Sequence, residues 1–340
     1  MAGRIVWALV KLYCRAGCSG KAVAAALAFH PPDPPFYEVV EKTAKGLTDS
    51  DDAQYDVILR GDIEALVRPV FSRTQVTQTV HKIETKSKSV INCFFFHHPQ
   101  AKATILFSHG NAADIGAMTP RFLEIATHLE VNVCGYDYSG YGGGTGSPTE
   151  HQVHYDAAAT LSFLQRVYQI RRSEIIVYGE SIGSGPTTKL AASKGEPFLG
   201  CVLHAPLKSG LRILTSNRIL CCCDIFPNID VIRRAKCPVW VIHGLADDQI
   251  PVIHGQDLHR NVPDEYKTDP WWVPRAGHSD IVYNNFKAYI VRFRKFLSLS
   301  LDRRERLGET NGASKSVEKG ENLEEGVDIV PRPESGNPKH

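Results

Sequence analysis

The sequence predicts an α/β fold in which helices cover both faces of a mostly parallel central sheet. Between about residues 76 and 300, short apolar runs rich in β-branched residues alternate with longer stretches of helical spacing. Strands that alternate with helices indicate a parallel sheet covered on both faces. The share of apolar residues is 43%, which is enough for a sizeable core.

The alternating pattern predicts the individual elements in chain order. Strands are expected at 90–98, 103–107, 131–136, 174–178, 201–204, 239–243 and 271–273. Helices are expected at 62–67, 120–129, 155–167, 182–192, 254–260 and 281–297. Connections between parallel strands are right-handed almost without exception, so we expect the helices to cross over the sheet in a right-handed sense.

Composition divides the chain into three parts. Residues 1–75 form a membrane-association and linker segment, in which Lys11 and Arg15 interrupt apolar patches and the prolines of 31–35 end the anchor. Residues 76–300 are expected to form the α/β domain. Residues 301–340 are polar, charged and poor in aromatic side chains, which is typical of a disordered tail.

Charge and cysteine usage exclude several classes of function. The 39 basic and 37 acidic residues nearly balance and form no long basic run, so no nucleic-acid partner is expected. The nine cysteines are odd in number, include the consecutive run 221–223 and contain no paired CxxC signature. We therefore expect reduced thiols in the cytosol, no metal site and no cofactor.

One motif predicts nucleophilic catalysis. Gly179-Glu180-Ser181-Ile182-Gly183 follows the apolar strand and opens a helical segment, as a nucleophile elbow requires. The turn is too tight for side chains on either side of the serine, which explains the glycines. The alternative is an ordinary glycine-rich strand-to-helix turn. The context favours an α/β-hydrolase fold with Ser181 as its nucleophile.

A serine nucleophile needs a base and an orienting acid, which follow it in that fold in the order acid, then histidine. The strand at 239–243 leads into Asp247 and Asp248, at the edge of the sheet where active sites lie. His278 follows the last strand in a loop of small residues, and we expect it to be the base. Asp280 is expected to be a helix N-cap. The positions of Asp247 and Asp248 alone do not decide which of them is the orienting acid.

The oxyanion hole requires two backbone N–H groups aimed at one point. Ile182 follows the nucleophile and supplies one; Asn111, in the loop after the strand at 103–107, is expected to supply the other. In that loop we expect His109 to brace the backbone and Asp114 to be a loop or cap residue. The glycine-rich loop 138–144 lacks the ending of a P-loop and is expected to form a wall of the site.

These motifs occur together in a familiar order. LFSHGNAADIG, YDYSGYG, VYGESIGSGP, HAPLKSGLR, FPNID, VIHGLADDQIP and AGHSDI, with AALAFHPPDPPFY near the N-terminus, closely resemble the α/β-hydrolase domain-containing 17 family. That family consists of membrane-associated protein depalmitoylases. The resemblance implies a triad of Ser181, Asp247 and His278, and so favours Asp247 over Asp248.

The resemblance also implies the activity and its setting. It implies hydrolysis of S-palmitoyl thioesters on membrane-associated proteins, at the cytosolic face of the plasma membrane or endosomes. Alternatives are a carboxylesterase or lipase acting on small esters or lipids, and a non-catalytic membrane-associated binding protein. Two features depart from the family. The family has a dense cluster of cysteines near its N-terminus, whereas this chain has only Cys14 and Cys18 there, and Glu180 replaces the family's usual glutamine before the nucleophile. Cys14 and Cys18 are candidate S-acylation sites, and the segment 207–230 is expected to contribute to a lid.

Overall fold

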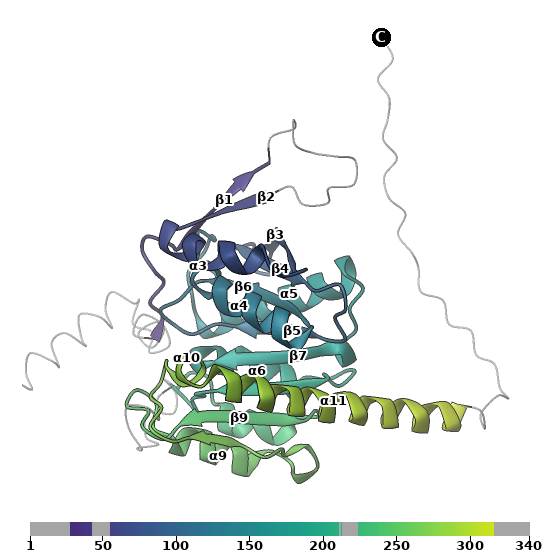
Figure 1. Cartoon of the computed structure of the whole chain (residues 1–340). Helices are drawn as coiled ribbons and strands as arrows, with labels where there is room; N and C mark the ends of the chain where they lie inside the picture. Colours follow the sequence, from purple (N-terminus) through teal and green to yellow (C-terminus); the bar gives the residue numbers. More distant parts are fainter. Residues whose placement is uncertain (1–27, 43–54, 211, 213–223, 316–340) are drawn as a thin grey trace, which may run out of the picture. The chain divides into compact units, whose positions relative to one another are not determined.

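A computed structural model describes residues 28–42, 55–210, 212 and 224–315. Its described strands form one ten-stranded sheet in the order β1-β2-β3-β4-β6-β5-β7-β8-β9-β10 (Figure 1). The strands are β1 Tyr37–Glu41, β2 Tyr55–Leu59, β3 Thr77–Glu84, β4 Val90–His97, β5 Thr104–Ser108, β6 Asn132–Tyr136, β7 Ile175–Glu180, β8 Gly200–His204, β9 Val239–Gly244 and β10 Trp271–Val273. Neighbours from β6 to β10 are parallel, whereas β1 to β4 pair antiparallel.

Helices cover both faces of this sheet, which confirms the predicted fold class. The α-helices are α3 Gly61–Phe71, α4 Ile115–Leu129, α5 Glu150–Val167, α6 Ser184–Ala191, α8 Asn228–Val231, α9 Ile253–Asn261, α10 Ile281–Asn284 and α11 Phe286–Lys315. Along β4, Phe94 and Phe96 pack with the core of α4 and α11, and the alternate residues Cys93 and Phe95 pack with that of α5 and α6. Successive strand residues point to opposite faces, so one strand serves two cores.

The folded domain begins earlier than residue 76, which corrects the predicted boundary. β1 and β2 pair with each other, and Tyr55 of β2 pairs with Val80 of β3. Tyr37 and Leu59 are buried in the same core as α4. These short strands lie at the sheet edge with several exposed positions, so they lack the continuous apolar run that identified the central strands.

The C-terminal boundary also differs from the prediction. The expected helix 281–297 is two helices, α10 and α11, and α11 continues to Lys315. Contacts divide the chain into one unit of residues 1–301 and another of residues 302–340. Residues 302–315 are therefore helical, not disordered; the remaining part of the predicted tail lies outside the described residues.

Helix α4 starts five residues before the predicted Pro120. Asp114 is its N-cap and accepts a hydrogen bond from the Ala117 N–H at 2.9 Å. A side-chain cap of this kind satisfies an otherwise unpaired amide of the first turn. The expectation that Asp114 is a cap residue is confirmed, and Pro120 lies inside the helix rather than at its start.

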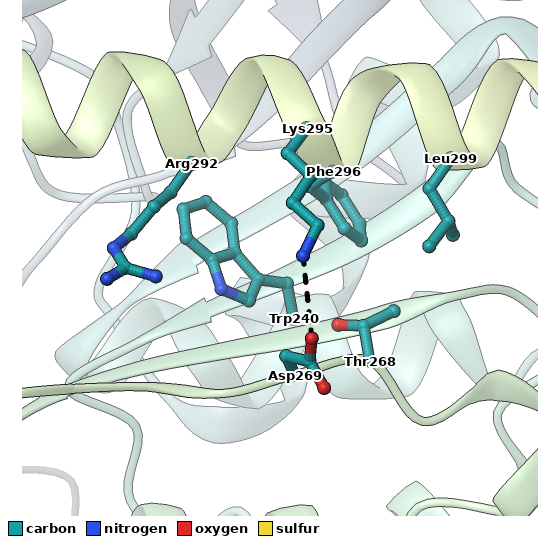
Figure 2. Close-up of a pocket in the computed structure, with 7 residues that line it drawn as sticks. All are labelled: Trp240, Thr268, Asp269, Arg292, Lys295, Phe296 and Leu299. Atoms are coloured by element: carbon teal, nitrogen blue, oxygen red, sulfur yellow. Dashed lines mark ion pairs between the residues drawn. The ribbon is translucent and has the colours of Figure 1, made fainter.

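Three further observations concern membrane spans, metal ligands and pockets. In the described part of the chain, no helix is both long and apolar enough to cross a bilayer. Among the same residues, no three His, Cys, Asp or Glu side chains gather as metal ligands. A hollow between α11 and β9, shown in Figure 2, is lined by Trp240 near the start of β9. It therefore lies near the amino-terminal end of β9, whereas Asp247 follows the carboxyl end of that strand.

Candidate active site

The candidate nucleophile occupies a sharp turn between strand and helix. β7 ends at Glu180, the 3-10 turn η3 spans Ser181–Gly183, and α6 follows directly. Ser181 has a φ of 53°, in the left-handed region that residues with side chains rarely adopt. Such strain is the mark of a nucleophile elbow, where the turn lifts the serine above the sheet edge.

Close backbone packing explains both glycines of the motif. A Cβ on Gly179 would collide with the carbonyl oxygen of Gly183 and with Thr187 Oγ1. A Cβ on Gly183 would collide with the carbonyl oxygen of Ser108, at the end of β5. The expectation that side chains cannot be accommodated on either side of the serine is confirmed.

The structure brings Ser181, His278 and Asp247 into one hydrogen-bonded chain. Ser181 Oγ lies 3.0 Å from His278 Nε2, and His278 Nδ1 lies 2.8 Å from Asp247 Oδ2. The three residues follow β7, β10 and β9, whose carboxyl ends meet at one sheet edge. Asp248 is exposed, so of the two acids Asp247 is the one that contacts the histidine. This geometry suits an activated serine nucleophile.

Asp247 is held in its ionised form. Its Oδ1 accepts hydrogen bonds from the N–H groups of Gln249 at 3.0 Å and Ile250 at 2.8 Å. Burial alone raises the pKa of Asp247, but bonds from His243, His278 and the backbone outweigh it and hold this pKa well below its usual value. An anion that persists near neutral pH can stabilise the positive charge His278 acquires when it takes a proton.

His243 supports this acid and was missed from the sequence. Its Nε2 lies 2.8 Å from the Ile250 carbonyl oxygen and 3.2 Å from Asp247 Oδ2. Both atoms only accept, so Nε2 carries the proton and donates to them. His243 thereby fixes the loop that bears Asp247. The available signal was a buried histidine four residues before the acid, at the end of a strand.

The loop bearing His278 is fixed by backbone bonds and by Asp280. Asp280 Oδ1 accepts a hydrogen bond from the Gly277 N–H at 2.7 Å, and the Ala246 N–H donates to the Ala276 carbonyl at 2.9 Å. Asp280 occupies the N-cap position of α10 but makes no side-chain cap bond to it. Asp280 is thus the N-cap residue by position, as predicted, but its carboxylate holds the histidine loop and not the backbone N–H groups of the first turn.

The two predicted oxyanion donors lie beside the nucleophile. Ile182 follows Ser181 within η3, and a Cβ built on Gly110 would lie 3.9 Å from Ser181 Cβ. The loop containing Asn111 is therefore adjacent to the serine, as the fold requires. The roles of the N–H groups of Asn111 and Ile182 in binding an oxyanion remain predictions.

The oxyanion loop is held from outside by the segment 28–37, which the sequence did not assign to the site. Asn111 Oδ1 accepts hydrogen bonds from the His30 N–H at 2.9 Å and the Tyr141 hydroxyl at 2.8 Å. Asp114 Oδ2 accepts one from the Phe36 N–H at 2.7 Å. Residues 28–37 are thus part of the site's framework.

A buried network braces the inner side of the same loop. His109 Nδ1 lies 2.7 Å from the Gly110 carbonyl oxygen, and its Nε2 lies 3.2 Å from Asp137 Oδ1. Tyr37 donates its hydroxyl proton to the other oxygen of Asp137, and the Tyr138 hydroxyl donates to the His109 carbonyl at 2.6 Å. The expectation that His109 braces the loop is confirmed. Tyr37 and Asp137 were missed because their partners are distant in sequence.

Part of the segment expected to form a lid is described. The Asn228 amide donates to the Leu207 carbonyl at 2.9 Å and approaches Ser184 Oγ at 3.3 Å. Phe226 packs against Gly185 and against the Phe29 ring. Both ends of this segment therefore contact α6 next to the nucleophile. Residues 213–223 and the candidate acylation sites Cys14 and Cys18 lie outside the described residues.

Comparisons with known proteins find relatives among the α/β hydrolases. A family model described as Hydrolase_4, serine aminopeptidase, S33, matches residues 99–216. Alpha/beta hydrolase domain-containing protein 17B of Homo sapiens is 34% identical over 296 residues, 85% of this chain and 95% of that protein. Protein 17C of Xenopus laevis is 35% identical over 311 residues, 88% and 95% of the two chains.

A more distant likeness is found among solved structures. The Pyrococcus furiosus esterase Pf2001 superposes with a TM-score of 0.56 at 17% identity, covering 68% of this chain and 94% of that one. The α/β hydrolase GrgF from Penicillium sp. sh18 gives a TM-score of 0.55 at 13% identity, covering 66% and 99%. At such identities the likeness establishes the α/β-hydrolase fold alone.

Proposed function

Because this chain belongs to the α/β-hydrolase domain-containing protein 17 family, and is thus an α/β hydrolase, we propose that it is a serine hydrolase that removes S-palmitoyl groups from proteins at the cytosolic face of a membrane. The observation that carries the serine mechanism is the hydrogen-bonded chain from Ser181 through His278 to Asp247. The choice of palmitoyl thioester as substrate is supported by the resemblance of the motifs. No cofactor is needed, since the triad supplies nucleophile, base and acid.

The proposed reaction proceeds in two halves. His278 Nε2 takes the proton of Ser181 as its oxygen attacks the thioester carbon, and the N–H groups of Asn111 and Ile182 bind the resulting oxyanion. The tetrahedral intermediate collapses, the C–S bond breaks, and His278 protonates the leaving thiolate. A water molecule, deprotonated by His278, then attacks the acyl-serine ester. The bond between the acyl carbon and Ser181 Oγ breaks, His278 returns the proton to Ser181, and the fatty acid leaves.

Substrate preference tests this proposal against the esterase and lipase alternative. A thiolate is a better leaving group than an alkoxide, so it departs with less help from His278. We expect the purified protein to turn over a palmitoyl thioester with a kcat/KM about tenfold above that of the matched oxyester, a barrier difference of about 1.4 kcal/mol. Both substrates are presented in identical mixed micelles, with uncatalysed hydrolysis subtracted.

Two outcomes would support the alternative functions, an esterase or lipase and a non-catalytic binding protein. An equal or higher kcat/KM for the oxyester would assign the protein to the carboxylesterases or lipases. A fluorophosphonate probe separates catalysis from mere binding, because only an activated serine reacts with it. If the folded protein is not labelled, it is a binding protein that has kept the fold.

Attachment to the membrane is proposed from the sequence of the N-terminal segment. Each buried methylene of an acyl chain contributes about 0.8 kcal/mol, and stable anchoring needs two signals. Two palmitoyl groups on Cys14 and Cys18, or one together with the apolar patch, meet that requirement. We expect Cys14→Ser with Cys18→Ser to move the protein from the membrane to the soluble fraction and to lower depalmitoylation in cells.

Turnover of a soluble thioester is the control for this double substitution. The two cysteines lie outside the proposed catalytic machinery, so the purified variant should cleave that substrate at the wild-type rate. If the variant remains entirely in the membrane fraction, the acyl anchor is wrong and the apolar segment alone holds the protein there.

A further inference from the structure

A buried hydroxyl from the glycine-rich loop 138–144 reaches the residue predicted to bind the oxyanion. Tyr141 is fully buried and donates its hydroxyl proton to Oδ1 of Asn111 at 2.8 Å. The same oxygen accepts the His30 N–H at 2.9 Å, and this N–H also lies 3.1 Å from the Tyr141 hydroxyl oxygen. Three groups therefore form a hydrogen-bonded triangle that holds the side chain of Asn111.

The loop that carries Tyr141 is itself fixed on both sides of the ring. Gly142 has a φ of 54°, in the left-handed region, and a Cβ there would collide with the Asp137 carboxylate. The Gly142 carbonyl accepts a hydrogen bond from the Asn92 amide at 2.7 Å. The Tyr141 ring contacts the His109 ring, with 5.5 Å between the ring centroids. The position of the Tyr141 hydroxyl is thus set by backbone and ring contacts together.

The hold on the Asn111 side chain bears on the reaction because the backbone N–H of Asn111 is the predicted oxyanion donor. A hydrogen bond weakens steeply as its angle closes, so a donor must be aimed before the negative charge develops. Asn111 lies in the loop after β5, next to Gly110, whose Cβ position is 3.9 Å from Ser181 Cβ. A loop residue is not oriented by a helix or a strand, so bonds to its side chain limit the rotation of its backbone.

We propose that Tyr141 is a positioning residue for the proposed hydrolysis: by holding Asn111 Oδ1, it aims the Asn111 N–H at the oxyanion. Tyr141 acts through Asn111 in this role and not by contact with the reacting atoms. The inference rests on the proposed serine mechanism. It goes beyond that mechanism by giving the glycine-rich loop a function in stabilising the transition state, in addition to the wall that the sequence predicts.

The test begins with Tyr141→Phe, which removes the hydroxyl and keeps the ring. We expect kcat to fall about tenfold, less than the hundredfold or more that loss of an oxyanion donor costs, because the N–H is still present but less well aimed. KM should stay unchanged, since the oxyanion exists only after the serine has attacked. Steady-state kinetics on a palmitoyl thioester and on the matched oxyester measure both parameters.

An alkyl trifluoromethyl ketone isolates the oxyanion from the rest of substrate binding. Ser181 Oγ adds to its carbonyl carbon, the C=O electron pair moves to the oxygen as an oxyanion, and His278 keeps the serine proton. Affinity of Tyr141→Phe for the ketone should fall about tenfold, in parallel with kcat. Affinity for the matched secondary alcohol, which forms no oxyanion, should stay at the wild-type value.

A double-mutant cycle tests whether Tyr141 acts through Asn111. Asn111→Ala removes the acceptor oxygen and leaves the backbone N–H in place. Both substitutions break the same bond, so the double variant should lose no more activity than Asn111→Ala alone. Tyr289→Phe is the matched control, because Tyr289 is also fully buried and donates its hydroxyl proton to Tyr178 at 3.3 Å. It should keep the wild-type kcat, and circular dichroism verifies that each variant is folded.

Three results would each overturn the role of Tyr141: an unchanged kcat in folded Tyr141→Phe, equal losses of affinity for ketone and alcohol, or additive losses in the cycle. If Tyr141→Phe does not fold, Asn111→Ala decides alone, and an unchanged kcat and ketone affinity in that variant would overturn the proposal. Failure of the serine mechanism would be seen separately, as turnover that survives Ser181→Ala and a wild-type protein that binds the ketone no more tightly than the alcohol.

Discussion

Ser181→Ala should reduce hydrolysis by about a million-fold and leave the fold intact. The serine hydroxyl supplies the attacking oxygen, and its described bond is to His278 Nε2 at 3.0 Å. Alanine has the same Cβ, so it enters the strained left-handed turn at no additional steric cost. The turn is held by the close packing of Gly179 and Gly183, which the substitution does not touch.

The measurement combines single-turnover kinetics on a thioester with labelling by a fluorophosphonate probe. Ser193→Ala is the matched control, since Ser193 lies just beyond the far end of α6 and bonds to the Leu190 carbonyl. The control should be labelled and active, whereas Ser181→Ala should be neither. Near wild-type turnover by correctly folded Ser181→Ala protein would show that another residue is the nucleophile.

The centre of the fold could be predicted because its signals are local. β5, β7, β8 and β9 are buried almost throughout and appear in the sequence as largely apolar runs bounded by turns. β1 and β2 could not be found in this way, because several of their positions are exposed and neither forms a continuous apolar run. The early start of α4 was missed because Pro120 is a stronger breaker signal than Asp114 is a cap signal.

The site shows the same division between local and distant information. The turn around Ser181 and the loops of Asp247 and His278 carry spacing that is specific to their chemistry. The supporting residues carry no such spacing. His30 bonds to Asn111, which is 81 positions away in the sequence, and Tyr37 bonds to Asp137, which is 100 positions away. Tyr141 is separated from Asn111 by 30 positions, so only the folded chain identifies it as the partner.

Asp247→Asn should lower kcat by roughly ten-thousand-fold, as in other triads. The oxygen of the new amide would still accept the N–H bonds of Gln249 and Ile250. Its NH2 group would then face His278 Nδ1, where the carboxylate now accepts a hydrogen bond. Nδ1 would have to accept instead, which places the imidazole proton on Nε2. In that tautomer His278 cannot take the proton of Ser181.

Asp248→Asn is the control that decides between the neighbouring acids. Asp248 is exposed, and substitutions at such positions change free energies by about 0.5 kcal/mol or less, a factor of roughly two in rate. Both variants are compared by kcat at several pH values, with circular dichroism to verify folding. The reverse ranking, a large loss for Asp248→Asn and a small one for Asp247→Asn, would move the triad acid to Asp248. Because the two substitutions change the same net charge one residue apart, their difference reports the bond to His278 and not the field of the loop.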